Sequence, residues 1–178
     1  YSGTGSNATI GHGLNAAPKL YITKRRDGSN DWETYHGALG ATYYGKLNAT
    51  DSFTNAGGTS RWNDTEPTSS VFSVGTSSNT NGSGNTYVAY CFAPVEGYST
   101  FGKFTGNGSA DGAFVYTGFK VRFLIIKQYD GTNGWFMWDT ERDSLNPNTA
   151  LFSANASNAE QSQANPAIDF LSNGFKAR

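Results

Sequence analysis

Apolar and polar residues alternate along the chain in short runs, and two of these runs resemble each other. Within Lys19–Thr23, Leu20 and Ile22 share one side, as in a strand with one covered face. The turn sequence Asp27–Asn30 follows, with a glycine for positive φ and short polar side chains that bond the local backbone. An aromatic run then returns over residues 32–36. The pattern predicts a β-hairpin.

The segment Phe114–Asp139, FVYTGFKVRFLIIKQYDGTNGWFMWD, repeats this hairpin. A constant separation of 103 positions relates Lys24 to Lys127, Asp27 to Asp130 and Trp32 to Trp135, and it also relates residues 1–6 to 104–109 and Phe72 to Phe175. Self-similarity at a fixed period indicates an internal duplication. We therefore expect two repeats, residues 1–103 and residues 104–178, packed as one unit.

The second repeat is shorter than the first. The same separation pairs Gly75 with Arg178, so residues 76–103 have no counterpart. They include Tyr87–Phe92, YVAYCF, the most strand-like run of the first repeat. We expect either that the polypeptide continues past Arg178 or that a strand comes from elsewhere. The start at Tyr1, without methionine, also suggests a piece of a longer protein or a processed chain.

The outgoing strand of the second hairpin, Phe123–Ile126, is apolar on both faces and is expected to need cover on both sides. We therefore place this hairpin centrally, where the two repeats pack together. The patterns elsewhere predict strands at residues 43–47, 71–74, 86–92 and 150–152, a small-residue loop at 51–60, a turn that holds a tryptophan at 61–67, a mobile polar loop at 77–85 and a short helix at 155–164.

The composition favours β-structure throughout. The chain has 22 glycines, 15% aromatic residues and only 15% charged residues, and β-favouring aromatics and threonine are plentiful. We predict an all-β fold, an antiparallel β-sandwich built from two internally repeated halves. A chain of 178 residues can bury one good core or two small ones.

Charge and cysteine content argue against several classes of partner. The net charge is −1 and the pI about 6.1, so there is no electrostatic footprint for nucleic acid. No apolar segment approaches the roughly 20 residues that a membrane-spanning helix needs. The single cysteine, Cys91, rules out an internal disulfide and a cysteine zinc site, and it is expected to be a small buried hydrophobe. We expect no cofactor and no metal.

The sequence also lacks recognisable arrangements of catalytic residues. A glycosidase needs two converging carboxylates, but no acidic pair recurs in both repeats. No strict G-x-S-x-G motif accompanies the two histidines, and the oxygen-rich turn at residues 27–31 is too short for an EF-hand loop. We expect a non-enzymatic protein in which the acids have turn or surface roles and the histidines form no catalytic triad: Glu33, Asp64, Glu66, Asp139, Glu141, Asp143, His12 and His36.

Aromatic residues offer the best candidates for ligand binding, because flat rings stack on the apolar faces of sugars while amides bind the hydroxyls. Four of them, Trp32, Tyr35, Trp135 and Trp138, belong to the repeated hairpin and are expected to pack in the core. We predict that a ligand site, if the chain has one, consists of Trp62, Tyr43, Tyr44, Asn81 and Asn85, the last two in the loop at residues 77–85.

Over nearly its whole length the sequence resembles a domain of unassigned function found in virion proteins of tailed, often marine, bacteriophages. The most specific phrases are TYVAYCFAPVEGYS and DGAFVYTGF, and the likeness extends over residues 3–24, 65–120 and 168–178.

The resemblance implies a lectin-like or jelly-roll-like β-sandwich in a tail fibre, appendage or capsid-surface protein on the virion exterior. The expected partners are other virion proteins, further copies of the chain and a host-surface glycan bound by multivalent weak contacts. The resemblance implies no catalytic residues in this chain. Two alternatives stay open: a carbohydrate-active hydrolase on a lectin-like scaffold, and a purely architectural capsid decoration protein.

Overall fold

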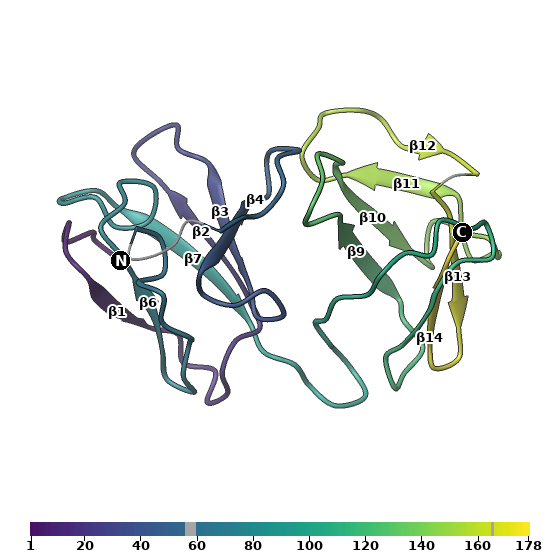
Figure 1. Ribbon diagram of the computed structural model, residues 1–178, viewed down its shortest axis with the longest axis horizontal. Coiled ribbons are helices and arrows are strands. Elements are labelled where there is room, and N and C mark those ends of the chain that lie inside the picture. The colour runs from purple at the N-terminus through teal and green to yellow at the C-terminus, as the bar shows by residue number, and fades with distance from the viewer. Residues whose placement is uncertain (56–59, 165) are drawn as a thin grey trace. The chain divides into compact units, whose positions relative to one another are not determined.

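A computed structural model describes residues 1–55, 60–164 and 166–178 (Figure 1). These residues form antiparallel strands and turns with no helix, which confirms the predicted all-β fold. Accordingly, the described residues contain no helix that could span a membrane. The chain divides into two compact units: unit 1 is Tyr1–Pro94 with Tyr129–Thr132, and unit 2 is Val95–Gln128 with Asn133–Arg178.

The strands follow one another along the chain and are mostly short. In unit 1 they are β1 (Ala8–Gly11), β2 (Leu20–Arg25), β3 (Trp32–His36), β4 (Tyr43–Lys46), β5 (Thr54–Asn55), β6 (Val71–Val74) and β7 (Tyr87–Phe92). In unit 2 they are β8 (Phe114–Tyr116), β9 (Phe123–Lys127), β10 (Trp135–Asp139), β11 (Ala150–Ser153), β12 (Gln161–Ser162), β13 (Ile168–Leu171) and β14 (Gly174–Ala177).

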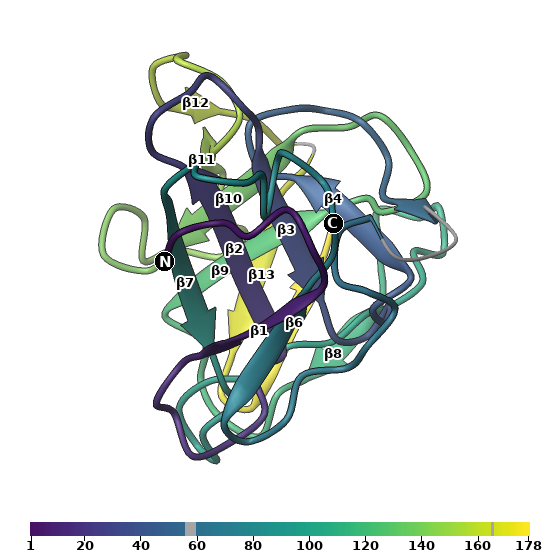
Figure 2. The same cartoon turned by 90° about the vertical axis from the view of Figure 1, so that its left-hand side faces the viewer.

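Unit 1 is sandwich-like. A two-stranded sheet, β1-β6, lies across a five-stranded sheet of order β5-β4-β3-β2-β7 (Figure 2). Alternation along β2 and β3 turns Tyr21 and Tyr35 inward, where their rings stack with centroids 4.4 Å apart. Trp62 meets Tyr21 edge-on at 4.9 Å, and Phe72 of β6 closes the cluster at 4.8 Å from Tyr21. Aromatic pairs of this kind contribute about 0.5–1.5 kcal/mol each beyond the area they bury.

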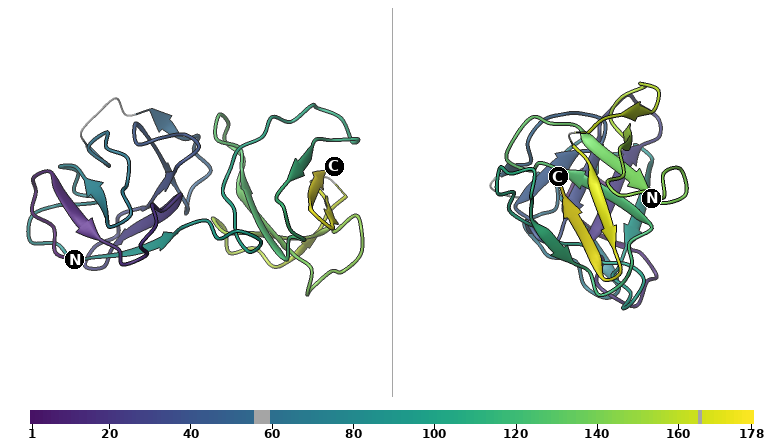
Figure 3. Two further views of the ribbon diagram at one scale, coloured as in Figure 1. Left: turned by 90° about the horizontal axis from the view of Figure 1, so that it is seen from below. Right: turned by 90° about the vertical axis from the view of Figure 1, so that its right-hand side faces the viewer.

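Unit 2 repeats the plan with different strands. A four-stranded sheet, β12-β11-β10-β9, and a three-stranded sheet, β13-β14-β8, enclose a second core (Figure 3, where β13 and β14 are the yellow strands). Trp138 of β10 is 1% exposed and forms the largest buried surface there. The rest of this core is aliphatic or phenylalanine: Val121, Leu151, Ile168, Phe170 and Phe175.

Strand pairing is equivalent in the two units. The β2–β3 ladder pairs Tyr21 with Tyr35, and the β9–β10 ladder pairs the residues 103 positions later, Leu124 with Trp138. The strands β4 and β5 correspond to β11 and β12 at a separation of 107 instead, because the link before β11 is four residues longer than the link before β4. The duplication itself, as a statement about descent, stays a prediction.

Two strands have no counterpart in the other unit. In unit 1, β7 pairs with β2 along one edge of the sheet, whereas the equivalent strand β9 pairs with β10 alone among the strands described in unit 2. Conversely, β13 extends the small sheet of unit 2 and unit 1 has no strand there. The predicted boundary after residue 103 is not tested by this division.

Several local predictions need correction. The helix predicted at residues 155–164 is absent, and the short strand β12 lies there instead, because β11 offers it a ladder. The loop predicted at residues 51–60 contains the two-residue strand β5, and its residues 56–59 lie outside the described part of the chain. The loop at residues 77–85, expected to be a mobile tip, has a buried centre at Thr80–Gly82.

The predicted strands themselves are confirmed. Residues 71–74 match β6, and residues 43–47, 86–92 and 150–152 match β4, β7 and β11 to within one residue at each end. The turn at residues 61–67 does hold Trp62, and Asn63 and Asp64 within it adopt positive φ values of 51° and 45°.

Candidate ligand-binding site

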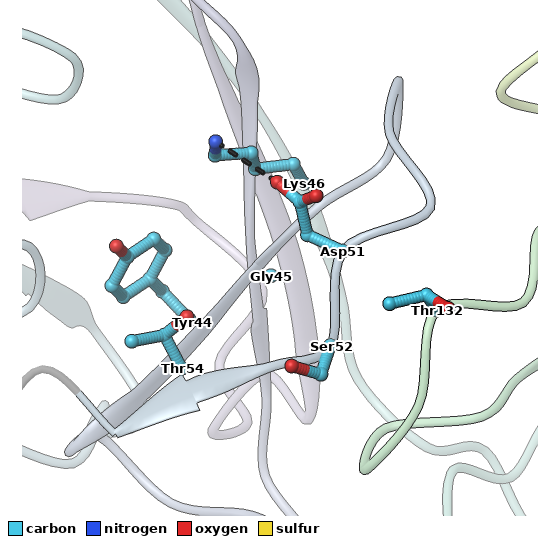
Figure 4. A pocket seen from close by; sticks show the side chains of 7 residues that line it. All are labelled: Tyr44, Gly45, Lys46, Asp51, Ser52, Thr54 and Thr132. Atoms are coloured by element: carbon cyan, nitrogen blue, oxygen red, sulfur yellow. Dashed lines mark hydrogen bonds and ion pairs between the residues drawn. The ribbon is translucent and has the colours of Figure 1, made fainter.

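A hollow lies beside β4 and β5 in unit 1, and we call it the Tyr44 hollow (Figure 4). Its volume is about 290 Å³, close to the lower end of the range for small-molecule sites. Lys46 and Asp51 lie at one end of it and Tyr44 with Thr54 at the other. The residues that line it are Tyr44, Gly45, Lys46, Asp51, Ser52, Thr54 and Thr132.

A glycine on β4 lets the wall of the hollow form. A Cβ added at Gly45 would lie 2.6 Å from ring atoms of Phe53, so only a residue without a side chain lets that ring lie against the strand. Phe53 is 8% exposed, and burying a ring of this size stabilises the fold by about 1.5–3 kcal/mol. The ring thereby fixes the loop that carries Asp51 and Ser52.

Lys46 links two carboxylates at the hollow. Its Nζ lies 3.2 Å from Asp51 and 3.3 Å from Asp31. The hydrogen bond to Asp51, together with the one to Asp31, raises the pKa of Lys46 above its usual value against the effect of burial. The amide of Asn48 donates to Asp31 at 2.9 Å and, with Lys46, lowers the pKa of that carboxyl. Both shifts favour the charged forms of Lys46 and Asp31.

An arginine covers part of the aromatic wall. The guanidinium carbon of Arg61 lies 4.4 Å from the centre of the Tyr44 ring, a cation–π contact. Arg61 donates to Ser77 at 2.8 Å, which fixes the guanidinium over the ring. One ring face of Tyr44 is thus taken, and a ligand has at most the other face and the ring edge.

A buried carboxylate orients the arginine from the core side. Glu33 on β3 is fully buried, and its Oε2 lies 3.1 Å from Nε of Arg61. Neither atom makes an aligned hydrogen bond within the described residues, so the contact is an ion pair. The second oxygen of Glu33 accepts from Asn79 at 2.5 Å, and Asn79 accepts from Asn30 at 2.6 Å. This network ties β3 to the loop at residues 77–85.

The structure scatters the residues predicted to bind a ligand. Tyr44 alone lines the hollow, and Tyr43 is half-buried beside it. Trp62 and Asn81 have no exposed surface: the indole donates to the carbonyl of Tyr43 at 3.1 Å, and the Asn81 amide donates to Gly75 and Ser6 at 2.8 and 2.6 Å.

Both of these side chains therefore hold the fold together and present no face to a surface ligand. Asn85 is partly exposed but accepts from Arg25 at 2.8 Å, away from the hollow.

Sequence reasoning missed most of the hollow. Lys46, Asp51, Ser52 and Thr54 lie close to Tyr44 along the chain, but each looked like an ordinary strand or turn residue. The one available signal was the short spacing of an aromatic pair, a lysine and an aspartate within residues 43–51. Asp31 could not be added to them without the β3–β4 register, which pairs Glu33 with Lys46.

Several of the acids and histidines considered for catalysis accept hydrogen bonds from backbone amides, whereas Glu33 is buried on β3. Glu66 accepts from Tyr35 and, at 2.7 Å, from the backbone of Ala41. Burial alone would raise the pKa of Asp139, but hydrogen bonds from the backbone and side chain of Arg142 lower it.

Other members of the set behave alike: Asp143 accepts from the backbone at Leu145 and Thr149, Glu141 pairs with Arg122, and His12 and His36 accept from the backbone of Leu14 and Ala38. In the described part of the chain, no group of three or more His, Cys, Asp or Glu residues could hold a metal ion.

The comparison with known proteins identifies a family, but the function of that family is unknown. A family model described as a domain of unknown function (DUF7483) matches residues 1–178, so the chain belongs to this family. No curated protein and no solved structure matches the chain.

Proposed function

We propose that this member of the DUF7483 family is a non-enzymatic structural and adhesion module on the exterior of a bacteriophage virion. The Tyr44 hollow binds a host-surface glycan weakly, and several copies of the chain together provide the avidity. The sequence resemblance supports the virion location, and the chemistry of the hollow supports the ligand class.

One observation carries the glycan assignment: Lys46 forms ion pairs with Asp31 and Asp51 beside a tyrosine ring. Carboxylate oxygens and an ammonium group bind sugar hydroxyls as acceptors and donor, and Ser52 and Thr54 add hydroxyl partners. The ring of Tyr44 supplies the flat apolar surface on which a pyranose face packs.

The same geometry favours binding over hydrolysis. A glycosidase keeps one carboxylic acid protonated near neutral pH by raising its pKa. At the hollow the effect is opposite, because hydrogen bonds from Asn48 and Lys46 lower the pKa of Asp31. Asp51 is paired with the same lysine at 3.2 Å and faces no second carboxyl group across the hollow.

Weak single-site affinity is expected from the contact that Arg61 makes with Tyr44. With one ring face occupied at 4.4 Å, the ligand gains only part of the stacking energy that a free ring offers. Repetition of the module converts such an affinity into useful avidity, since linked sites raise the effective concentration of the ligand.

A glycan array read with the chain displayed on a tetrameric carrier tests the proposal. We expect binding to bacterial-surface glycans by the tetramer, a signal at least about tenfold lower for the free chain, and a similar loss in the variants Tyr44→Ala and Lys46→Ala. Tyr98→Ala is the matched control, because Tyr98 is a 79% exposed tyrosine outside the hollow.

Absence of any glycan signal from the tetramer would leave the architectural alternative and reject adhesion. Release of reducing sugar from a bound glycan would show hydrolysis and contradict the proposal that the module is non-enzymatic. Antibody labelling of intact particles tests the location separately: label on the outer surface supports the proposal, and particles that carry none of the protein contradict it.

A further inference from the structure

The large sheet of unit 2 ends at β9, on the side where unit 1 carries one strand more. In unit 1, β7 runs antiparallel to β2 with Leu20 opposite Phe92 and Ile22 opposite Tyr90. In unit 2, β9 has the position of β2, and β10 is its one partner among the described strands. We call the unpaired side of this strand the β9 edge.

The backbone of β9 presents hydrogen-bonding groups along that edge. Thr140 donates to the carbonyl of Arg122 at 3.0 Å, in register with the β9–β10 ladder. Hydrogen-bonded pairs alternate along an antiparallel ladder, so Leu124 and Ile126 bond to β10. The amide and carbonyl groups of Phe123 and Ile125 therefore point to the β9 edge.

The same parity holds where the edge is filled in unit 1. Arg26 donates to the carbonyl of Thr86 at 2.8 Å, so by alternation Ile22 forms a hydrogen-bonded pair with Tyr90. Ala89 and Cys91, between those pairs, turn their side chains toward the core of unit 1. Along this part of the edge, β7 thus carries the small residues Ala89 and Cys91 inward and the large, half-exposed residues Tyr90 and Phe92 outward.

Side chains along β9 suit such a strand. Leu124 and Ile126 pack against the core of unit 2, while Phe123 on the other face is 59% exposed. An exposed apolar edge without proline is a template for strand addition, and natural proteins usually pair or protect it. Strand addition derives affinity from backbone hydrogen bonds and specificity from alternate side chains.

We propose that the β9 edge is a docking site for an extended polypeptide segment. The segment adds to the sheet antiparallel to β9, with aromatic or large aliphatic residues opposite Phe123 and Ile125 and small residues between them. The inference is independent of the glycan proposal, because it concerns protein binding by unit 2.

A peptide with the sequence Thr86–Phe92, with Cys91→Ala and lysines added at both ends, is the direct probe. It is added in excess to the full chain, and amide hydrogen exchange is followed residue by residue. We expect the exchange of Phe123 and Ile125 amides to slow by at least tenfold, with little change at Leu124, whose amide already bonds to β10.

Two N-methylated peptides provide the matched control. A methyl group on the backbone nitrogen at the Tyr90 position blocks a bond to β9 and should abolish the protection. The same group at the Ala89 position faces away from β9 and should leave the protection in place. Equal behaviour of the two peptides would overturn the proposal, since it depends on this parity.

A variant of the chain tests the edge from the other side. Ile125→Pro removes the one donor that Ile125 offers at the edge and leaves the β10 hydrogen bonds of its neighbours. Folding of the variant is checked by its near-ultraviolet dichroism, and loss of peptide protection at Phe123 is the expected result. Unchanged amide exchange at Phe123 and Ile125 when the peptide is added to the unaltered chain would contradict the proposal.

Discussion

Unit 1 and unit 2 place different chemistry at equivalent positions of one hairpin. The inward side chains of unit 1 are two phenols and a carboxylate, and those of unit 2 are aliphatic or aromatic without charge. Although both ladders keep the same register, only the polar set needs partners from distant loops. The residues 103 positions apart are Tyr21 and Leu124, Glu33 and Phe136, and Tyr35 and Trp138.

This difference shows that the pairing register of the two hairpin strands does not depend on whether their inward side chains are polar or apolar. Phe136, at the position that Glu33 has in unit 1, packs against the core of unit 2 and meets Trp138 edge-on with centroids 6.1 Å apart. Glu33 instead requires Arg61 and Asn79, because a buried carboxylate without partners would be strongly destabilising. The polar hairpin therefore orders the loops around the Tyr44 hollow, which the apolar hairpin has no means to do.

The largest expected effect comes from breaking the buried ion pair. Arg61→Met leaves Glu33 charged and fully buried, and the free energy of unfolding should fall by about 3–5 kcal/mol. The double variant Glu33→Leu, Arg61→Met gives unit 1 an apolar pair like that of unit 2 and should recover most of the loss. Chemical denaturation measures both. A single variant within about 1 kcal/mol of the parent chain would show that the pair is not essential.

A smaller effect should separate the two stacked phenols. Tyr35 donates to Glu66, whereas the hydroxyl of Tyr21 is buried without a partner in the described chain. Tyr35→Phe should cost about 1–2 kcal/mol, and Tyr21→Phe should be neutral or slightly stabilising, since it removes an unsatisfied polar group. Thermal unfolding measures the difference, and equal costs for the two variants would refute the assignment.

The smallest expected effect is on the stability of unit 1 at acidic pH. The folded chain lowers the pKa of Asp31, so the ionised carboxyl contributes stability above its unfolded pKa of about 4, and this contribution is lost as the pH falls through the folded value. Asp31→Asn should therefore flatten the acid limb of unit 1, that is, the fall in its stability at low pH; Gly134 lies at the equivalent position of unit 2. Unfolding midpoints between pH 2 and pH 6 test this; a parallel acid limb in the variant would exclude Asp31 as its source.

The two hairpins could be predicted from the sequence because the alternation of apolar and polar residues that identifies their strands is local. Leu20 and Ile22, or the aromatic pair Trp135 and Trp138, indicate a strand from a span of only a few residues. By contrast, β1 and β12 have no such pattern, and they are strands because β6 and β11 offer them ladders. The correspondence of β4 with β11 was hidden by the longer link before β11.

The candidate site was only partly predictable. Tyr44 was chosen for its ring, and the ring does line the hollow. Trp62 was chosen for the same reason, but its indole lies in one core cluster with Tyr21 of β2 and Phe72 of β6 and has no exposed surface. Lys46 gains its importance from Asp31 and Asp51, and no spacing along the chain reveals that both reach the same ammonium group.

The stacked tyrosines give unit 1 an optical reporter of its own. Burial raises the pKa of Tyr21 well above the usual value, and burial with the Glu66 contact does the same for Tyr35, so neither forms phenolate while unit 1 stays folded. The tyrosines of unit 2, Tyr98 and Tyr116, are 79% and 70% exposed. Phenolate absorbance from Tyr21 and Tyr35 thus reports the opening of unit 1.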